Sequence, residues 1–435
     1  MKYFWYFIYN FFFLPAFIVG IYFSSLFNKK VKAGLKGRRE FFKYLASKAK
    51  TLDSNRRNIL IHCASLGEFE QSKPLIEDLD KTCKYNFIVS FFSPSGYNHA
   101  KLDFVSSGII KTYLPFDFKS YVSEFLDIIR PSAVVFVKYD IWFNMLSQIK
   151  HRGIFTIVIN ASLSLNKYNL INRIFYLYKR FVYNLIDIIV VTDEHEMVRF
   201  RNLIKNDSRI FVFGDTKYER IRRAKENSIG CEYIDKSVLK NKFVFIVGSS
   251  WDKDEEIIFP VINKINSNGL LNTGNIITLI VPHEPSEDNL EEIEYNIRNR
   301  YPHLSSIRYS NLTRYSNENV ILVDRIGILM GLYKYADIAY VGGGFGSGLH
   351  NVLEPAGYGI PVLFGNEKLS SEARELVKIG GGIAVGDSRA LYRTLVTFLR
   401  KSELKNSTGM NAISVFNKRA DVSVKIAELI NKYTN

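Results

Sequence analysis

The segment "HCASLGEFEQSKPLIEDL", residues 62–79, places a carboxylate, Glu68, directly after a glycine where an apolar strand pattern ends. Gly67 would let the backbone approach a ligand closely. A glutamate near the start of a helix often does no more than stabilise that helix. The alternative is a catalytic base that removes a proton from a substrate hydroxyl. The residues of this segment alone leave both interpretations open.

A second candidate site is the glycine-rich loop in "YVGGGFGSGLHNVLEPAGYGIPVLFG", residues 340–365. Its spacing matches neither GxGxxG nor GxxxxGK[ST], which argues against a dinucleotide fingerprint and a P-loop. A glycine loop that leads into a helix still suits an anion such as a phosphate. We therefore predict a donor phosphate loop formed by Gly343, Gly344 and Gly346.

The helix expected after this loop carries Asn351 and Glu354, which lie one turn apart and share a face. A carboxylate there is poorly suited to a phosphate but well suited to ribose hydroxyls. The simpler alternative is a helix cap with an exposed glutamate.

Three further residues follow predicted strands. Lys217 in "GDTKYE" is either a surface lysine or a cation aimed at a ligand. His283 in "IVPHEP" is a lone histidine, and such residues are more often structural than functional. Ser93 in "FFSPSGY" predicts a helix cap, although the same helix start suits an anion.

These residues must be positioned by alternating strands and helices. Nearly continuous apolar runs separated by helical stretches predict parallel sheets covered on both faces, hence an α/β chain with two doubly wound, Rossmann-like domains. Ligands of such folds bind at the carboxyl ends of the strands, and we expect the site in a cleft between the domains. The predicted strands are 58–64, 86–92, 133–138, 154–160, 186–192, 242–248, 275–281, 337–342 and 360–365.

A polar stretch, residues 221–240, interrupts this pattern and predicts the linker between the domains. The first domain is then expected at 29–220 and the second at 241–410. Residues 411–435 predict a C-terminal helix that packs back on the first domain.

Composition narrows the class of protein. The net charge of +15 suggests an anionic partner. Nucleic acid is not expected, because the body lacks a helix-turn-helix pattern, an RNP-type strand and a basic stripe interleaved with aromatic residues. The three cysteines and seven histidines show no metal-ligand spacing. We therefore expect neither a metal nor a cofactor.

Residues 1–28 predict a membrane anchor, because residues 3–27 carry no charge. That length crosses a hydrocarbon core of about 30 Å, although the aromatic density equally suits a helix lying in the interface. A cleaved signal peptide is disfavoured, because only Lys2 precedes the apolar run. The basic run at 28–39 follows, so the positive-inside rule predicts a cytoplasmic body, and the same run suits an anionic membrane surface.

The chain resembles the bacterial 3-deoxy-D-manno-octulosonic acid (Kdo) transferases. The resemblance spans about residues 1–400 and rests on the order of a set of motifs. These are "HCASLGEFEQSKPLI", "FFSPSGY", "YLPFD", "DIWFN", "NASLS", "GDTKYE", "IVPHEP", "IGILMGLYKYADIAYVGGGF" and "HNVLEPAGYGIPVLFG".

This resemblance implies a GT-B glycosyltransferase with an acceptor-binding first domain and a CMP-Kdo-binding second domain. It implies transfer of Kdo from CMP-Kdo to the 6-hydroxyl of the lipid A precursor lipid IVA, at the cytoplasmic face of the inner membrane. The reaction would invert the anomeric centre and serve lipopolysaccharide synthesis. A membrane-associated GT-B enzyme with another activated sugar and another lipid acceptor is the alternative.

The resemblance also implies roles for individual residues. Glu68 matches the family's general base, and Lys217 matches a position that stabilises the transition state. The positions that match residues holding CMP are Pro282, His283, Ile326, Gly327, Ile328, Asn351, Val352, Leu353 and Glu354.

Three positions depart from the family pattern. Lys138 stands at the family's stabiliser position, where an acid is usual, while Asp140 keeps the second acid of the motif. His283 stands where an arginine is common. Trp251 and Asp252 replace a frequent His-Glu pair. The expected absence of a metal is compatible with a CMP-sugar, because the leaving group is a monophosphate that cations such as Lys217 can neutralise.

Overall fold

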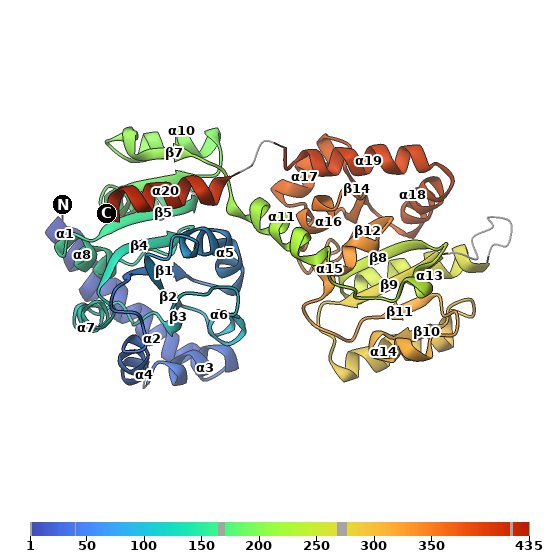
Figure 1. The fold of residues 1–435 in the computed structure, drawn as a ribbon, viewed down its shortest axis with the longest axis horizontal. Coiled ribbons are helices and arrows are strands. Elements are labelled where there is room, and N and C mark those ends of the chain that lie inside the picture. Colours follow the sequence, from blue (N-terminus) through green and yellow to red (C-terminus); the bar gives the residue numbers. More distant parts are fainter. Residues whose placement is uncertain (1, 40, 164–169, 268–275, 418–420, 435) are drawn as a thin grey trace. The chain divides into compact units, whose positions relative to one another are not determined.

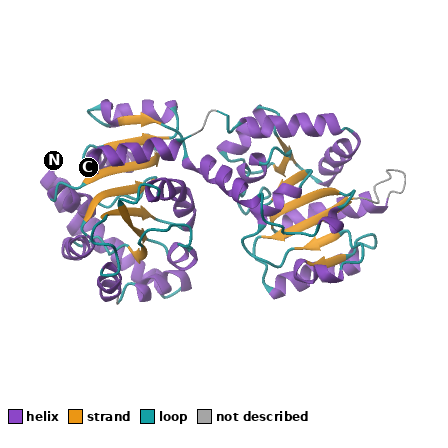
Figure 2. Ribbon diagram, in the orientation of Figure 1, coloured by secondary structure: helices purple, strands orange, loops and turns teal. Residues whose placement is uncertain are grey.

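The structure is a computed structural model that describes residues 2–39, 41–163, 170–267, 276–417 and 421–434. The chain divides into two compact units, one of residues 1–220 with 421–435 and one of residues 221–420. Each unit is built on a seven-stranded parallel sheet covered by helices (Figures 1 and 2). The chain therefore consists of the two Rossmann-like α/β domains that the strand pattern predicts.

The sheet of the first unit has the strand order β3-β2-β1-β4-β5-β6-β7. Alternate residues of each strand face opposite cores, so Leu60 packs in one core while Ile59 and Ile61 pack in the other. Burial on both faces explains the nearly continuous apolar runs. The strands are β1 Arg57–Cys63, β2 Tyr85–Phe91, β3 Ile109–Tyr113, β4 Pro131–Val137, β5 Phe155–Ala161, β6 Ile188–Val191 and β7 Ile210–Val212.

The helices of the first unit include the C-terminal one, α20. Its residues Val422, Ile426 and Ile430 are buried in the same core as Ile59. The helices are α1 Lys2–Ile8, the π-helix η1 Tyr9–Phe13, α2 Leu14–Ser25, α3 Lys29–Gly37, α4 Phe41–Ala49, α5 Leu66–Asp80, α6 Pro94–His99, α7 Lys119–Ile129, α8 Phe143–His151, α9 Leu170–Tyr183, α10 Glu194–Leu203, the short η2 Asp207–Arg209, α11 Thr216–Ser228 and α20 Val422–Thr434.

The second unit repeats the design with the strand order β10-β11-β9-β8-β12-β13-β14. Its strands are β8 Phe243–Ser250, β9 Ile276–Pro282, β10 Ser306–Arg308, β11 Val320–Leu322, β12 Ile338–Val341, β13 Val362–Gly365 and β14 Gly382–Val385. Its helices are α12 Lys236–Leu239, α13 Asp252–Ser267, α14 Glu287–Arg300, η4 Tyr309–Arg314, α15 Leu329–Leu332, η5 Tyr333–Tyr335, α16 Leu353–Gly357, α17 Ser371–Lys378, α18 Ser388–Arg400 and α19 Ser402–Ser414.

The boundaries between the units differ from those expected. Residues 221–240 hold the second half of α11 and all of α12, and they belong to the second unit. The reason is that Ile221, Ile234 and Val238 are buried despite the polar character of the stretch. Helix α19 continues past residue 410 to Ser414, and the chain returns to the first unit at residue 421.

The N-terminal segment packs along the first unit on one side. Trp5, Tyr9 and Leu14 are buried together with Phe143 of α8. The Tyr9 hydroxyl donates to Asp117 Oδ2 at 2.7 Å. Polar as well as apolar contacts therefore hold this segment on the domain.

Neighbouring Asn10 exchanges amide hydrogen bonds with Asn144 at 3.3 and 2.7 Å. The carboxylate of Asp117 also accepts from the backbone N–H groups of Asn144 and Met145, both at 2.8 Å. Burial raises the pKa of Asp117 to about 7, against the opposing effect of its hydrogen bonds. A buried carboxylate thus joins the N-terminal segment to the start of α8.

The other side of this segment is exposed and strongly aromatic. Its exposed large side chains include those of Tyr3, Phe4, Phe7, Phe11, Phe12, Phe13, Tyr22, Phe23 and Phe27. Among the described helices, Tyr3–Ser25 alone is long and apolar enough to cross a membrane. Its length and composition suit both a membrane span and a helix that lies in the interface.

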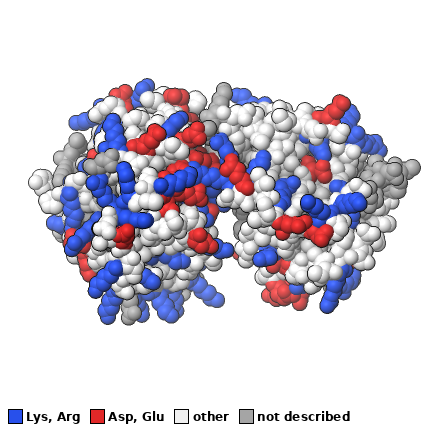
Figure 3. Space-filling model, viewed as in Figure 1, with Lys and Arg blue, Asp and Glu red and all other residues white. Residues whose placement is uncertain are grey.

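Basic side chains gather over α3 and α4, at the lower edge of the first unit in Figure 3. Their exposed members are Lys29, Lys30, Lys32, Lys36, Arg39, Lys43 and Lys48. Arg38 differs, because its guanidinium is partly buried and donates to the carbonyls of Gly34, Phe92 and Leu114. Burial lowers the pKa of Arg38 to about 10. Arg38 therefore fixes α3 to the ends of β2 and β3, while its neighbours face outward.

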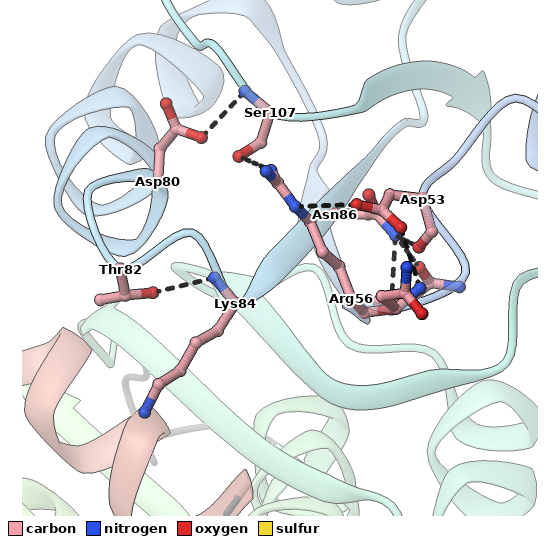
Figure 4. A network of polar contacts seen from close by, with 9 residues as sticks. Asp53, Arg56, Asp80, Thr82, Lys84, Asn86 and Ser107 are labelled. Carbon is pink, nitrogen blue, oxygen red and sulfur yellow. Dashed lines mark hydrogen bonds and ion pairs between the residues drawn. The ribbon is translucent and has the colours of Figure 1, made fainter.

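Polar side chains close the amino edge of the first sheet (Figure 4). Asn86 of β2 donates to the carbonyl of Asp53 at 2.8 Å and to Asn58 Oδ1 at 2.9 Å. Asp80 at the end of α5 accepts from the backbone N–H of Ser107 at 3.0 Å. These contacts attach loops to the sheet and leave the opposite, carboxyl edge to carry the chemistry.

Candidate functional site

Glu68 lies at the carboxyl edge of the first sheet, in the first turn of α5. Ser65 is the N-cap, and Ser65 and Glu68 form a capping box. The backbone N–H groups of Ala64 and Ser65 both donate to Glu68 Oε2, the latter at 3.3 Å. The capping role left open by the sequence is therefore real, but it occupies only one of the two carboxylate oxygens.

The surroundings of Glu68 suit a base. Its side chain is 5% exposed, and burial raises the pKa of its carboxyl group above the usual value. The hydrogen bond from Ala64 and the charge of Lys138 lower this pKa, whereas Asp140 raises it further. A carboxylate with a raised pKa is a stronger proton acceptor than an exposed one. Glu68, Lys138 and Asp140 are thus electrostatically coupled at one edge.

His62 connects this edge to the interior of the sheet. It lies in β1 and is 1% exposed. Its Nδ1 is 3.0 Å from the Ser90 hydroxyl and its Nε2 is 2.9 Å from Asp140 Oδ2. The imidazole therefore holds Asp140, which is partly exposed, in a fixed position beside Glu68.

The two strands next along the sheet end in unusual backbone conformations. Lys138 follows β4 with φ +69°, and Asn160 near the end of β5 has φ +53°. Left-handed conformations are costly for residues other than glycine and gather at functional sites. Asn160 exchanges hydrogen bonds with Thr216 at 2.7 and 3.1 Å. These bonds hold the start of α11, and with it Lys217, at the edge that carries Lys138.

Lys217 has an acidic neighbour. Its Nζ is 3.3 Å from Asp215 Oδ2, and its side chain is 23% exposed. A partly exposed pair of this kind contributes little to stability.

In the second unit, the glycine loop after β12 is held by a buried acid. Asp254 of α13 accepts from the backbone N–H of Gly343 at 2.8 Å and from the Tyr340 hydroxyl at 2.8 Å. Burial raises the pKa of Asp254, while these hydrogen bonds oppose the shift. The N–H of Gly343, expected to face a phosphate, is thus directed to a carboxylate instead.

The other two loop glycines have different surroundings. A Cβ atom on Gly344 would lie 2.5 Å from the backbone of Gly365, so Gly344 permits close packing against the end of β13. A Cβ atom on Gly346 would lie 3.5 Å from Lys253 Nζ. Gly346 therefore marks the part of the loop where a cation, absent from the sequence prediction, lies nearby.

The residues expected to hold CMP all follow strands at the same carboxyl edge. His283 follows β9 and is exposed, whereas Pro282 is buried. Ile326 is 84% exposed in the turn after β11, and the next residue, Gly327, has φ +87°. Ile328, which completes this turn, is partly buried.

The residues after the glycine loop behave as a helix start. Asn351 Oδ1 accepts from the N–H of Leu353 at 3.2 Å, and its amide donates to Glu354 Oε1 at 3.2 Å. Val352 and Leu353 are each 1% exposed, so only their backbone groups can face a ligand. Asn351 is exposed, which leaves it with Glu354 as the pair that can meet ribose hydroxyls.

Within the described ranges, no group of three or more His, Cys, Asp or Glu side chains is arranged to hold a metal ion.

Comparison with known proteins shows what the chain is similar to. Residues 34–220 match the family model described as 3-deoxy-D-manno-octulosonic-acid transferase (kdotransferase). The chain is related to the Kdo transferases. The Kdo transferase of Aquifex aeolicus is 29% identical over 355 residues, which cover 79% of this chain and 87% of the relative.

A second relative is longer than this chain. The bifunctional glycosyltransferase/methyltransferase of Fusobacterium nucleatum is 27% identical over 384 residues. The match covers 87% of this chain but only 57% of that protein. Among solved structures, UDP-GlcNAc 2-epimerase from Neisseria meningitidis has a TM-score of 0.61 at 16% identity, with 86% of this chain and 100% of that chain covered. This likeness concerns the fold alone, that of two Rossmann-like α/β domains.

Four residues near the candidate sites of this chain were not predicted from its sequence. They are His62, Lys253, Asp254 and His350. His62 lies on β1, Lys253 and Asp254 lie in the first turn of α13, and His350 lies in the loop between β12 and α16. Position alone could have flagged them, but their contacts depend on neighbours that are distant in the sequence.

Proposed function

We propose that the protein is an inverting glycosyltransferase that moves Kdo from CMP-Kdo to the 6-hydroxyl of lipid IVA in lipopolysaccharide synthesis. Kinship with the Kdo transferases supports the donor sugar. The observation that carries the mechanism is Glu68, a buried carboxylate with a raised pKa at the carboxyl edge of the first sheet.

In this proposal Glu68 takes the proton from the acceptor hydroxyl. Both backbone donors hold Oε2, so Oε1 is the atom that accepts the proton. The oxygen then attacks the anomeric carbon of Kdo as the bond to CMP breaks. A single base and a direct displacement give inversion at that carbon.

Asp140 and Lys138 tune this base in opposite directions, because Asp140 raises the pKa of Glu68 and Lys138 lowers it. Lys138 therefore keeps a larger fraction of Glu68 ionised at neutral pH. We assign Lys138 this electrostatic role, which differs from that of the acid usual at its position.

On the donor side, we assign Lys217 to the negative charge that grows on the leaving phosphate. The nucleotide is assigned to the edge of the second unit, where Pro282, His283, residues 326–328 and residues 351–354 end or follow strands. Lys253 beside Gly346 offers a second cation for the phosphate. With cations of this kind the transfer is expected to proceed without a metal.

We further propose that the N-terminal segment lies in the cytoplasmic surface of the inner membrane. Its buried side is tied to the domain through Tyr9 and Asp117, and its outer side is a continuous aromatic face. A helix that crossed the bilayer would have to leave these polar partners. An interfacial helix keeps them and still buries its aromatic face in lipid.

The exposed lysines and arginines of α3 and α4 extend this contact (Figure 3). Each cation near an anionic leaflet contributes about 1 kcal/mol of attraction. The proposed partners are thus CMP-Kdo, lipid IVA and an anionic membrane surface.

Mass spectrometry of lipid IVA after incubation with the purified protein and CMP-Kdo tests the function. The reaction is run with EDTA and without added metal. A gain of one or more Kdo units is expected, and the size of the gain counts the units. No gain from a folded, lipid-associated protein, with transfer from a UDP-sugar in a parallel reaction, would instead establish the alternative donor.

A further inference from the structure

Three aromatic rings meet at the carboxyl edge of the second sheet, each contributed after a different strand. Trp251 follows β8, His283 follows β9, and His350 follows β12 and its glycine loop. Strand β8 lies between β9 and β12 in the sheet. We call these residues the ring cluster.

The ring cluster has a defined geometry. The rings of Trp251 and His350 are nearly parallel, at 11°, and Trp251 Nε1 donates to His350 Nε2 at 3.0 Å. His283 lies against both rings, with its centroid 4.5 Å from each. Two rings joined edge to edge thus form one flat surface, and the exposed His283 ring covers it.

The hydrogen bond decides the protonation of His350. An indole N–H can only donate, so Nε2 of His350 must accept and carries no proton. The neutral imidazole then has its proton on Nδ1. Burial, together with the charge of His283, lowers the pKa of His350, which favours the same neutral form. His350 is therefore a neutral donor and not a cation.

His350 is also fixed to the glycine loop. Its backbone N–H donates to the carbonyl of Gly342 at 3.1 Å. A Cβ atom on Gly343 would lie 3.2 Å from its Cδ2. The ring therefore lies close to Gly343, where a larger residue would crowd it, and its tautomer determines which group it presents.

We propose that Trp251 holds His350 as the neutral Nδ1–H tautomer, and that Nδ1–H donates to an oxygen of the nucleotide bound at this edge. This inference rests on the proposed function for the identity of the nucleotide, CMP. Trp251 is a positioning residue, because it acts on the ligand through His350. Trp251 stands where the resemblance leads one to expect a histidine.

The test is long-range ¹H–¹⁵N correlation NMR on the full chain with ¹⁵N-labelled histidine, combined with calorimetric titration of CMP. His350→Gln identifies the His350 signals. The wild type is expected to show a protonated Nδ1 and an unprotonated Nε2 at His350. Trp251→Phe, which keeps a ring but removes the donor, should give mixed tautomers and weaken CMP binding about tenfold.

Trp142→Phe is the matched control, because Trp142 lies in the first unit and should leave the His350 signals unchanged. A protonated Nε2 in the wild type, or His350 signals and CMP affinity unaffected by Trp251→Phe, would overturn the proposal. Either result could coexist with Kdo transfer by the wild type. A wild type that binds no CMP would overturn the assigned ligand together with the proposed function, even if the Nδ1–H tautomer were observed.

Discussion

The two sheets end in edges of opposite character. The edge of the first unit carries ionisable groups that influence one another: Glu68, His62, Lys138 and Asp140. The edge of the second unit carries aromatic rings, among them Trp251 and His283, and a glycine loop that the buried acid Asp254 holds. In the function proposed above, the edge of the first unit is the proton-transfer edge and the edge of the second unit is the ligand-holding edge.

This difference follows from the types of residue that stand at the carboxyl ends of the strands in each unit. In the first unit, left-handed residues follow or end strands and carry polar side chains, as Lys138 and Asn160 do. In the second unit, Ser249 near the end of β8 is left-handed too, but Trp251 follows it. Small changes at strand ends are therefore enough to divide the chemistry between two similar domains.

The largest effect is expected from a substitution of Glu68 at the edge of the first unit. Glu68→Gln should lower the rate of Kdo transfer about 10³-fold while CMP affinity stays unchanged. Glutamine preserves the capping box, so the helix should form normally. The measurement is initial rate by mass spectrometry beside CMP titration. Glu70→Gln, on the same helix, is the control, and wild-type turnover in Glu68→Gln would reduce Glu68 to a cap.

The holding role of the second edge is tested at Asp254. Asp254→Ala should lower the free energy of unfolding of the second unit by about 3 kcal/mol, because several buried donors lose their acceptor. CMP binding should weaken as the glycine loop loses its attachment. Thermal unfolding and CMP titration measure both effects. Asp252→Asn changes an exposed carboxylate of the same helix and should alter neither the unfolding nor CMP binding. Equal effects in the two variants would mean that Asp254 does not hold the glycine loop.

A third test concerns the attachment of the N-terminal segment to the first unit. Tyr9→Phe should weaken attachment of the N-terminal helix by about 2 kcal/mol, because a buried carboxylate loses a donor. Hydrogen exchange of residues 3–25 should accelerate. Tyr3→Phe removes a hydroxyl from the exposed side and serves as the control. Unchanged exchange in Tyr9→Phe would mean that packing alone holds the helix.

The smallest expected effect concerns pH. Transfer should rise with pH as Glu68 loses its proton, and the raised pKa places this rise above the range of an ordinary glutamate. Lys138 lowers that pKa, so removing its charge must move the rise to higher pH. Lys138→Asn tolerates the left-handed backbone and is the variant to measure. A pH profile identical to that of the wild type would remove Lys138 from the proton-transfer edge.

Much of the fold was predictable because its central strands are long and apolar on both faces. The runs at 58–64 and 275–281 correspond to β1 and β9, within a residue or two. Strands such as β7 Ile210–Val212, β10 Ser306–Arg308 and β11 Val320–Leu322 have only three residues. Periodicity cannot identify segments that short, because their pairing with neighbours determines them.

The candidate site was predictable to the extent that it depends on local sequence. The "SLGE" segment places Glu68 at the start of a helix after a strand, as the structure does. The contact between Trp251 and His350 joins residues 99 positions apart and leaves no local pattern. The same holds for His62 and Asp140, whose pairing appears only when β1 and β4 lie side by side.

The return of α20 to the first unit also bears on how the protein is made. Residues 221–420 are an insertion in a domain whose last helix is synthesised after them. Until Val422, Ile426 and Ile430 leave the ribosome, one face of the first sheet lacks part of its cover. The first domain therefore completes its core only after the second has been synthesised in full. A fragment that stops at residue 220 would expose that apolar face and is expected to aggregate.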